Sequence, residues 1–213
     1  MKTRFFLPLA LVLLLASGCA GQTSSAVPPA QASFQPAIPD ASSLEAREEL
    51  AGYLQDIVGA DGKVFQAKDD RGNLLDTAKI IENPQQPGTF LAISHCYDSQ
   101  GTARVNLACS TDPLHWTYVV TLAGEKGQNA TQPTIYPVEQ GFMAAWEQEP
   151  KNHIRLAYYD NWEALRTAQP SHTFDCPRLG WYAEGTPCIY SATSTSADIG
   201  FHYYKDRKAA LLF

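Results

Sequence analysis

The chain has 213 residues, a net charge of −6 at pH 7 and a hydrophobic share of 45%. That length and that share are enough for one domain with a real core. Nucleic acid is not expected as a partner, because phosphates require a stripe of Lys and Arg and the chain has no such run.

The first predicted element is an export signal over residues 1–18. Two basic residues precede an apolar run at 5–16, and small residues lead up to Cys19. The run is too short for a mature transmembrane helix. The letters ASGC resemble the lipobox of bacterial lipoproteins, which implies lipidation of Cys19. Ala20 then implies the outer membrane or cell surface as the location. An ordinary signal peptide with a chance cysteine is the alternative.

Residues 19–42 are predicted to form a disordered tether. They are rich in Ala, Ser, Gln and Pro and carry almost no charge, so they bury too little apolar surface to offset the cost of ordering. A flexible segment of this length has a mean reach of about 25 to 30 Å. The globular domain is therefore expected over residues 43–213, held just off a membrane surface.

The domain is predicted to begin with one short helix and to continue as strands. Ser42 and Glu45 form a capping box, Leu50 and Leu54 lie on one helical face, and Gly59 ends the helix. Short runs of beta-branched and aromatic residues follow, separated by turn signals. The strands expected from these runs are 63–67, 89–95, 103–110, 116–122, 133–138, 141–148, 153–159, 187–192 and 199–204.

These strands recur with a period near 50 residues. The matching segments begin at Pro133 and Pro187, at Leu107 and Leu156, and at Phe90 and Phe142. Three or four strands per period predict propeller blades, each a small antiparallel sheet that buries its faces against its neighbours. A beta sandwich is the alternative.

The order of motifs resembles the five-bladed propeller glycoside hydrolases of the arabinanase and beta-xylosidase type. The motifs are ACSTDPLHW, TQPTIYPVEQGFMAAWE, NHIRLAYYDNWEAL, EGTPCIYSA and FHYY, which lie within residues 60–213. The resemblance implies an all-β, five-bladed-type propeller. Only about three periods fit before Phe213, so we expect an incomplete ring of about three blade-like units, either truncated or atypical.

The resemblance also implies where catalysis would occur. Glycoside cleavage needs two carboxyl groups on one pocket, one as proton donor and one ionised. The family's general acid falls on Glu184, before Gly185 and the proline of an inner strand. For the second carboxylate we choose Asp76, because it precedes the same kind of apolar strand start. A glutamate that caps a strand or pairs with a basic residue is the alternative role for Glu184. Asp112 and Asp160 suit turns better than catalysis.

Four more residues are candidates for contact with a sugar. Trp146 and Glu147 are neighbours on one predicted strand, so alternation allows only one of them to face the pocket. His95 and His202 end strands near aromatic residues, although a hydrogen-bonded core histidine is the alternative. No metal or other cofactor is predicted, and the sequence does not indicate calcium.

Four cysteines remain after Cys19. We expect disulfides between Cys96 and Cys109 and between Cys176 and Cys188, because each pair is near in sequence and brackets a turn-rich segment. Four cysteines allow three pairings, so the others stay open. A zinc site is the rival interpretation, but the spacings match no ligand pattern.

Two functions are consistent with the sequence. The first is a surface-anchored lipoprotein, similar to glycoside hydrolases, that cleaves polysaccharide or oligosaccharide bonds. The alternative is a lipoprotein whose propeller binds glycan without cutting it or serves as a protein-interaction surface. In both cases the predicted partners are carbohydrate and, through Cys19, a membrane. Whether the protein is an enzyme stays open at this point.

Overall fold

The computed structural model describes residues 44–124, 127–180, 183–205 and 208–212. The chain divides into two compact units, residues 1–57 and 58–213. The export signal, Cys19, the tether and the predicted cap Ser42 lie outside the described residues. None of the described helices is long and apolar enough to cross a membrane.

The predicted helix is present as α1 (Leu44–Gln55), followed by the 3-10 turn η2 (Ile57–Gly59). None of its side chains is buried. Leu50 and Leu54, which we expected on one apolar face, are 57% and 64% exposed.

The first sheet is an antiparallel meander in the order β1-β2-β3-β4. Its strands are β1 (Asp76–Glu82), β2 (Phe90–Tyr97), β3 (Ala103–Asp112) and β4 (His115–Ala123). The tight turns between strands are made by aspartates. Asp98 accepts hydrogen bonds from the amides of Gln100 and Thr102, and Asp112 accepts them from Leu114 and His115. The predicted turn role of Asp112 is confirmed.

The second sheet repeats this meander in the order β5-β6-β7-β8. Its strands are β5 (Ala130–Pro137), β6 (Phe142–Gln148), β7 (His153–Tyr159) and β8 (His172–Asp175). The short helix α2 (Trp162–Arg166) interrupts the connection from β7 to β8, and Asn161 caps it by accepting the amide of Ala164. Neither α2 nor β8 was predicted.

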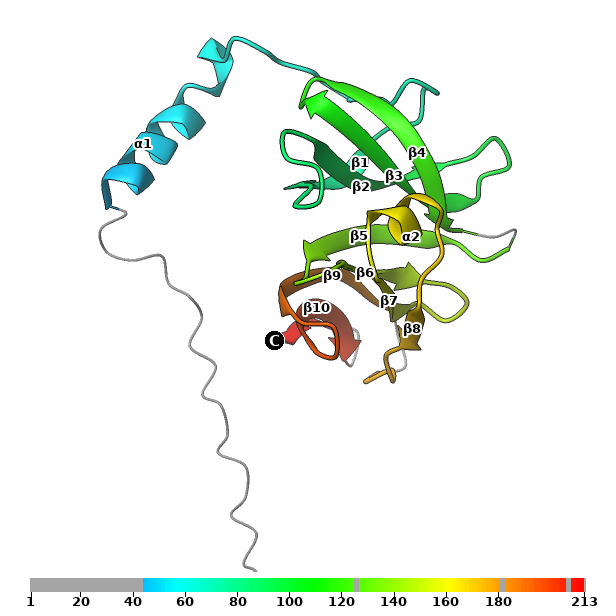
Figure 1. Cartoon of the computed structure of the whole chain (residues 1–213). Helices are drawn as coiled ribbons and strands as arrows, with labels where there is room; N and C mark the ends of the chain where they lie inside the picture. Colours follow the sequence, from blue (N-terminus) through cyan, green and yellow to red (C-terminus); the bar gives the residue numbers. More distant parts are fainter. Residues whose placement is uncertain (1–43, 125–126, 181–182, 206–207, 213) are drawn as a thin grey trace, which may run out of the picture. The chain divides into compact units, whose positions relative to one another are not determined.

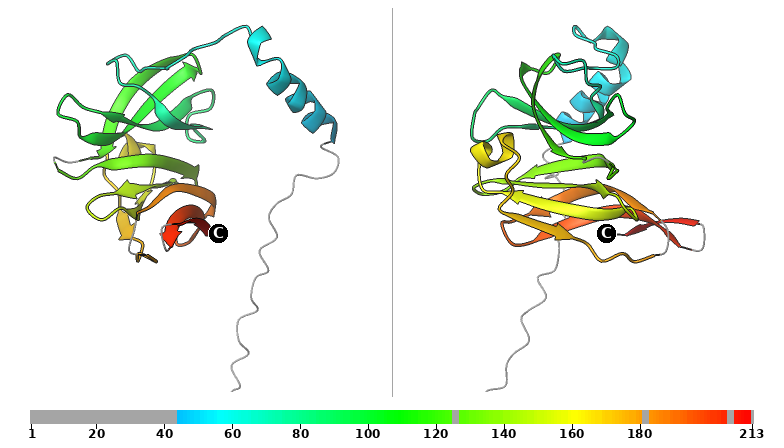
Figure 2. Two further views of the ribbon diagram at one scale, coloured as in Figure 1. Left: turned by 180° about the vertical axis from the view of Figure 1, so that it is seen from behind. Right: turned by 90° about the vertical axis from the view of Figure 1, so that its right-hand side faces the viewer.

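The third sheet has three described strands, in the order β11-β10-β9. They are β9 (Glu184–Ala192), β10 (Ala197–Lys205) and β11 (Lys208–Leu212). Figure 1 shows the three sheets following one another in chain order, from green to red, and Figure 2 shows them stacked. The first strand of the middle sheet, β5, packs against both β1 and β9.

This arrangement is that of propeller blades, so the all-β, propeller-like fold is confirmed, with about three blade-like units. The repeat has a structural basis, because Leu107 and Leu156 lie on the third strands β3 and β7 of successive sheets. The strand predicted over 63–67 is wrong. That segment forms no strand, and Phe65 is 87% exposed.

Two apolar clusters join the sheets. The larger cluster lies between the first and second sheets, and the smaller one lies between the second and third. The larger includes Leu91, Ile93, Val105, Leu107, Ile135, Phe142, Trp146, Tyr159 and Leu165. The smaller is built on Val138, Met143, Ala145, Ile154 and Ile189. Successive sheets therefore bury their facing sides against one another, as the repeat requires, and a third small cluster of Ala92, Ala108 and Trp116 is buried within the first sheet.

Candidate functional site

The first strand of each sheet begins with the same backbone distortion. Thr77, Gln132 and Thr186 have φ angles of +51°, +51° and +52°, in the left-handed region that non-glycine residues rarely adopt. At each of these positions the strand gains one residue over its neighbour, which is a β-bulge. Left-handed geometry at a β-branched residue costs on the order of 1 to 3 kcal/mol and is found mostly at functional sites.

The bulges define which residues of the three sheets are equivalent. Asp76, Thr131 and Gly185 directly precede the left-handed residues and pair with the second strand of their own sheets. Their partners in register are His95 on β2, Glu147 on β6 and His202 on β10. Three of the four predicted sugar-contacting residues thus occupy one repeated position.

Trp146, the fourth predicted contact residue, points the other way. It is 3% exposed in the cluster between the first and second sheets, and its indole N–H donates to Gln148 Oε1 at 2.9 Å. Glu147, the other residue of this pair on β6, therefore faces the opposite side, where it pairs with Thr131 near the beginning of β5.

In the first sheet, His95 lies between two groups of β1. Its Nδ1 is 2.9 Å from Thr77 Oγ1, and its Nε2 is 3.7 Å from Asp76 Oδ2. The imidazole is almost wholly buried, Asp76 has a half-exposed side chain, and Thr77 is exposed.

In the second sheet, Glu147 reaches across to the third. Its Oε1 accepts the backbone N–H of Thr186 at 2.8 Å, and its Oε2 accepts from Thr131 Oγ1 at 3.3 Å. A Cβ atom at Gly185 would overlap Glu147 Oε1. Glycine therefore follows Glu184 because the carboxylate of the neighbouring blade occupies the space that a side chain would need.

A polar cavity of about 200 Å³ opens beside Glu147, between the first and second sheets. Its lining combines two carboxylates, two amides, a hydroxyl and an aromatic ring that is 65% exposed. These are Glu147, Glu149, Asn129, Asn152, Thr131 and Tyr97, together with Ala103.

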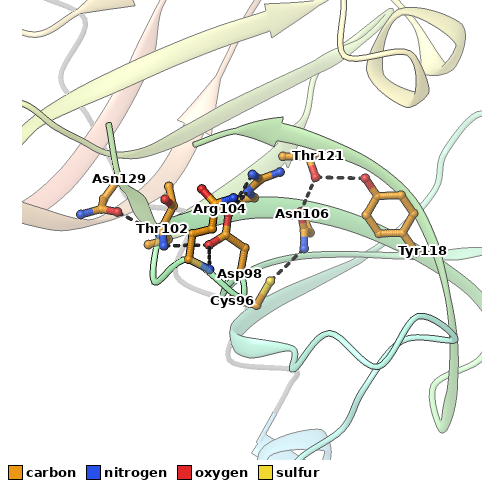
Figure 3. A network of polar contacts seen from close by, with 10 residues as sticks. Cys96, Asp98, Thr102, Arg104, Asn106, Tyr118, Thr121 and Asn129 are labelled. Atoms are coloured by element: carbon orange, nitrogen blue, oxygen red, sulfur yellow. Dashed lines mark hydrogen bonds and ion pairs between the residues drawn. The ribbon is translucent and has the colours of Figure 1, made fainter. Parts of the chain in front are cut away.

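Asn129 ties this cavity to the first sheet. Its Oδ1 accepts the amide of Ala103, and its Nδ2 donates to Glu149 Oε2 at 2.8 Å. Figure 3 shows Asn129 reaching the polar network of the first sheet, in which Asp98 holds Arg104. The hydrogen bond from the Ala103 amide to Asn129 therefore fixes the wall of the cavity that the first sheet provides.

Glu184, the predicted general acid, is fully buried at the start of β9. Its Oε1 accepts the amides of Leu179 and Gly180, while its Oε2 has no hydrogen-bond partner among the described residues. The amide contacts resemble the capping role that was the alternative interpretation. The unpartnered, buried Oε2 is a costly feature that capping does not explain.

The bulge register bears on the predicted pairing of Glu184 with Asp76. Asp76 is equivalent to Gly185 and lies one residue out of step with Glu184. Side chains of successive strand residues point to opposite faces. The two carboxyls therefore leave equivalent strands toward opposite sides, and their action as an acid and base pair stays a prediction.

The four cysteines in the described part of the chain are free. The predicted bond between Cys96 and Cys109 is not formed, and the strand register excludes it. Cys109 lies opposite Leu91, so the two cysteines are offset by roughly 17 Å along the β2–β3 hairpin. A disulfide requires Cα atoms within about 7 Å. The predicted bond between Cys176 and Cys188 is not formed either.

Burial raises the pKa of Cys96, Cys109 and Cys176, and each thiol lies near at least one acidic side chain. Desolvation raises the pKa of Cys96, and the negative charge of Asp69 adds to it. Desolvation and the nearby charge of Glu184 raise the pKa of Cys176. Both thiols are therefore protonated at neutral pH. Among the described residues, no group of three or more His, Cys, Asp or Glu side chains is placed to hold a metal ion.

Comparison with solved structures found likeness over part of the chain. An exo-beta-1,3-galactanase from Phanerochaete chrysosporium with galactose aligns at 12% identity and a TM-score of 0.49, covering 70% of this chain and 38% of that one. A variant of that enzyme with beta-1,3-galactotriose aligns at 13% and 0.44, covering 63% and 30%. A GH32 beta-fructofuranosidase from Bombyx mori aligns at 14% and 0.36, covering 63% and 28%.

The chain thus spans between 28% and 38% of the length of these proteins. No protein-family model matches the chain. No curated protein matches it either.

Proposed function

We propose that this protein binds carbohydrate at the end of the blades where β1, β5 and β9 begin. The observation that carries the proposal is the polar cavity of about 200 Å³ beside Glu147, with the exposed ring of Tyr97 on its lining. Sugars present hydroxyl groups on their edges and apolar faces on their rings. A ligand of that kind needs acceptors, donors and one flat aromatic surface at the same place.

The cavity supplies each of these groups. The carboxylates of Glu147 and Glu149 accept hydrogen bonds, and the amides of Asn129 and Asn152 both donate and accept. Glu147 is held from three sides by Thr131, Asn152 and the amide of Thr186. A carboxylate fixed in this way orients a ligand hydroxyl at little further entropic cost.

Calorimetric titration with neutral oligosaccharides, including arabino-, xylo- and galacto-oligosaccharides, tests the proposal. We expect at least one of them to bind, with about tenfold weaker binding after Tyr97→Ala or Glu147→Gln. Tyr190→Ala and Glu139→Gln are matched controls, because Tyr190 is half exposed on β9 and Glu139 is exposed in the β5–β6 turn. Equal affinity in all four variants, or no binding to any sugar, contradicts the proposal.

Hydrolysis of glycosidic bonds is a second candidate function, supported by one observation. Glu184 is a buried carboxyl group with an oxygen that accepts no hydrogen bond from the described part of the chain, at the position where the family resemblance implies a general acid. Asp76 stays the predicted base, although the register sends its side chain to the face opposite that of Glu184. The test is release of reducing sugar from arabinan and xylan, and of aryl alcohol from aryl glycosides. Loss of activity in folded Glu184→Gln supports the role, whereas an inactive wild-type protein that binds sugar favours binding alone.

We also propose that a lipid on Cys19 anchors the protein at the outer membrane or cell surface. The ASGC sequence after the apolar run supports this. In bacterial expression, labelled palmitate should enter the protein, and Cys19→Ser should abolish both the label and recovery with the membrane fraction. An unlabelled wild-type protein in the soluble fraction contradicts the anchor.

A further inference from the structure

A cluster at the start of β1 has the parts of a nucleophilic catalytic site, and carbohydrate binding does not account for it. Thr77 Oγ1 lies 2.9 Å from His95 Nδ1, and Asp76 Oδ2 lies 3.7 Å from His95 Nε2. A hydroxyl, an imidazole and a carboxylate therefore follow one another in a chain of contacts. We infer that this cluster hydrolyses carboxylic esters, with Thr77 as nucleophile and His95 as general base.

The geometry agrees with this assignment of roles. The contact between Thr77 and His95 is within the hydrogen-bond reach required of a nucleophile and its base. The contact to Asp76 has ion-pair length, and such contacts shorten when substrate binds. A negative charge beside Nε2 favours the tautomer with the proton on Nε2. That tautomer leaves Nδ1 free to accept the proton of Thr77.

Burial and backbone shape suit the same roles. The hydroxyl-bearing Thr77 is exposed, whereas the imidazole of His95 is 4% exposed and shielded from water. Thr77 has a φ of +51°, and the register between β1 and β2 skips Thr77 and Ala78. At this bulge the Thr77 hydroxyl meets His95 of the neighbouring strand, and the amide of Ala78 directly follows the nucleophile. The amide after a nucleophile is a recurring oxyanion donor.

Comparison with the other two blades shows which features of this cluster are common to all blades and which occur in the first blade alone. All three inner strands have the left-handed residue, so that feature alone belongs to the blade. The third blade also has a threonine and a histidine in the equivalent positions, Thr186 and His202, but Gly185 replaces the acid. In the second blade the equivalent positions hold Thr131, the left-handed Gln132 and Glu147, so that blade has no imidazole there. Within the described blades, only the first combines hydroxyl, imidazole and carboxylate.

The reaction balances with water as the only co-reactant. Thr77 Oγ1 attacks the ester carbonyl carbon, and its proton moves to His95 Nδ1. The bond from that carbon to the alkoxy oxygen breaks, and the departing oxygen takes the proton from His95. A water molecule then attacks the threonyl ester with the same base, which releases the carboxylic acid and restores the Thr77 hydroxyl. Asp76 is a positioning residue, because it acts through His95.

The test uses the purified full-length chain in detergent with p-nitrophenyl acetate. We expect a burst of p-nitrophenol and an acetyl group on Thr77, located by mass spectrometry of peptides. Thr77→Ala should abolish the adduct and lower the burst rate about 100-fold, and Thr77→Ser should restore both. Thr117→Ala is the control, since it removes an exposed threonine hydroxyl on β4, outside this cluster, and it should leave the burst unchanged.

Two further variants test the base and the positioning residue. His95→Gln should abolish the burst, provided that circular dichroism shows a folded protein. Because His95 is buried, the exposed Thr77 remains the decisive position if that variant unfolds. Asp76→Asn should slow the burst and Asp76→Glu should partly restore it. The inference is overturned if wild-type protein forms no acetyl adduct, if the adduct lies on a cysteine or lysine, or if Thr77→Ala keeps the burst. None of these outcomes depends on sugar binding.

Discussion

The two junctions between successive sheets are built from different chemistry. The first and second sheets share a large apolar cluster that includes the indole of Trp146. The second and third sheets share a smaller cluster, a bridge from Glu147 to the amide of Thr186, and an apolar cavity of about 410 Å³. That cavity is bounded by Met143 and Tyr158 of the second sheet and by Ile199 of the third.

Adjacent residues of β6 serve these opposite purposes. Trp146 packs in the apolar cluster between the first and second sheets, and Glu147 accepts the amide of Thr186 on the third sheet. A large apolar cluster packs the first pair of blades densely, whereas the second pair combines a smaller apolar cluster with a hydrogen bond and a cavity. The repeat therefore supplies equivalent backbones, and the side chains decide whether a junction is structural or open to chemistry. Four predictions test this difference.

The largest effect is expected at the first junction. Trp146→Ala should lower the free energy of unfolding by about 3 to 5 kcal/mol, because it empties a large volume in a packed core. Urea unfolding followed by circular dichroism measures this. Phe174→Ala is the control, since Phe174 is 59% exposed on the rim of the cavity at the second junction. It should change stability by about 0.5 kcal/mol or less. Similar losses in both variants would mean that the junctions do not differ.

At the second junction, Gly185→Ala should cost about 2 kcal/mol, because the new methyl group displaces the Glu147 carboxylate and breaks its bond to the amide of Thr186. Asp76→Ala alters the equivalent residue of the first sheet, whose side chain is half exposed, and should cost far less. Urea unfolding of both variants, and of Gly185→Ala combined with Glu147→Ala, measures the coupling. Additive costs in the double variant contradict the steric explanation.

Two substitutions of Glu184 are expected to differ in their effect on stability. Glu184→Gln keeps an oxygen that can accept the amides of Leu179 and Gly180, so stability should change little. Glu184→Leu leaves both amides unpaired and should cost about 2 kcal/mol. Thermal unfolding of the two variants distinguishes these results. A large loss in Glu184→Gln would show that the charge of Glu184, rather than its acceptor oxygen, is what the fold requires.

The smallest effect is expected at the outer edge of the second sheet. The side-chain hydrogen bond from Arg155 holds the pKa of Asp175 below its usual range, and His153 adds to the effect. Because the folded-state pKa is depressed, the stabilisation is present in full above the unfolded pKa, near 4, and is lost as pH falls through the folded pKa. Asp175→Asn should therefore cost up to about 1 kcal/mol at pH 7 and less at pH 3. Urea unfolding at both pH values checks this, and a cost independent of pH contradicts it.

Much of the fold could be predicted from local patterns. The predicted strands that begin at residues 89, 103, 116, 141 and 153 are present as β2, β3, β4, β6 and β7. Their alternation and turn signals arise within short windows of sequence, so no tertiary information is needed. The segment at 63–67 has the same local pattern but no partner strand, and composition alone does not reveal a missing partner.

The candidate site was less predictable, because it depends on register. No sequence signal marks Thr77, Gln132 or Thr186 as left-handed, because threonine and glutamine also occur in strands with regular extended backbone. The prolines that follow two of them, Pro133 and Pro187, are a faint signal of strand irregularity that could have been used. Thr77 itself escaped notice because its partner His95 lies on the next strand.

The sequence by itself determined that this chain is mostly short strands in a repeat near 50 residues, because periodicity and turns are local properties. Tertiary structure alone decided that Glu147 pairs with Thr131 near the beginning of β5, that Glu184 is fully buried, and that Cys96 is far from Cys109. It also decided that Thr77, His95 and Asp76 meet. Each of these outcomes depends on which residue lies opposite which across a sheet, and a shift of one residue in that register would reverse every face.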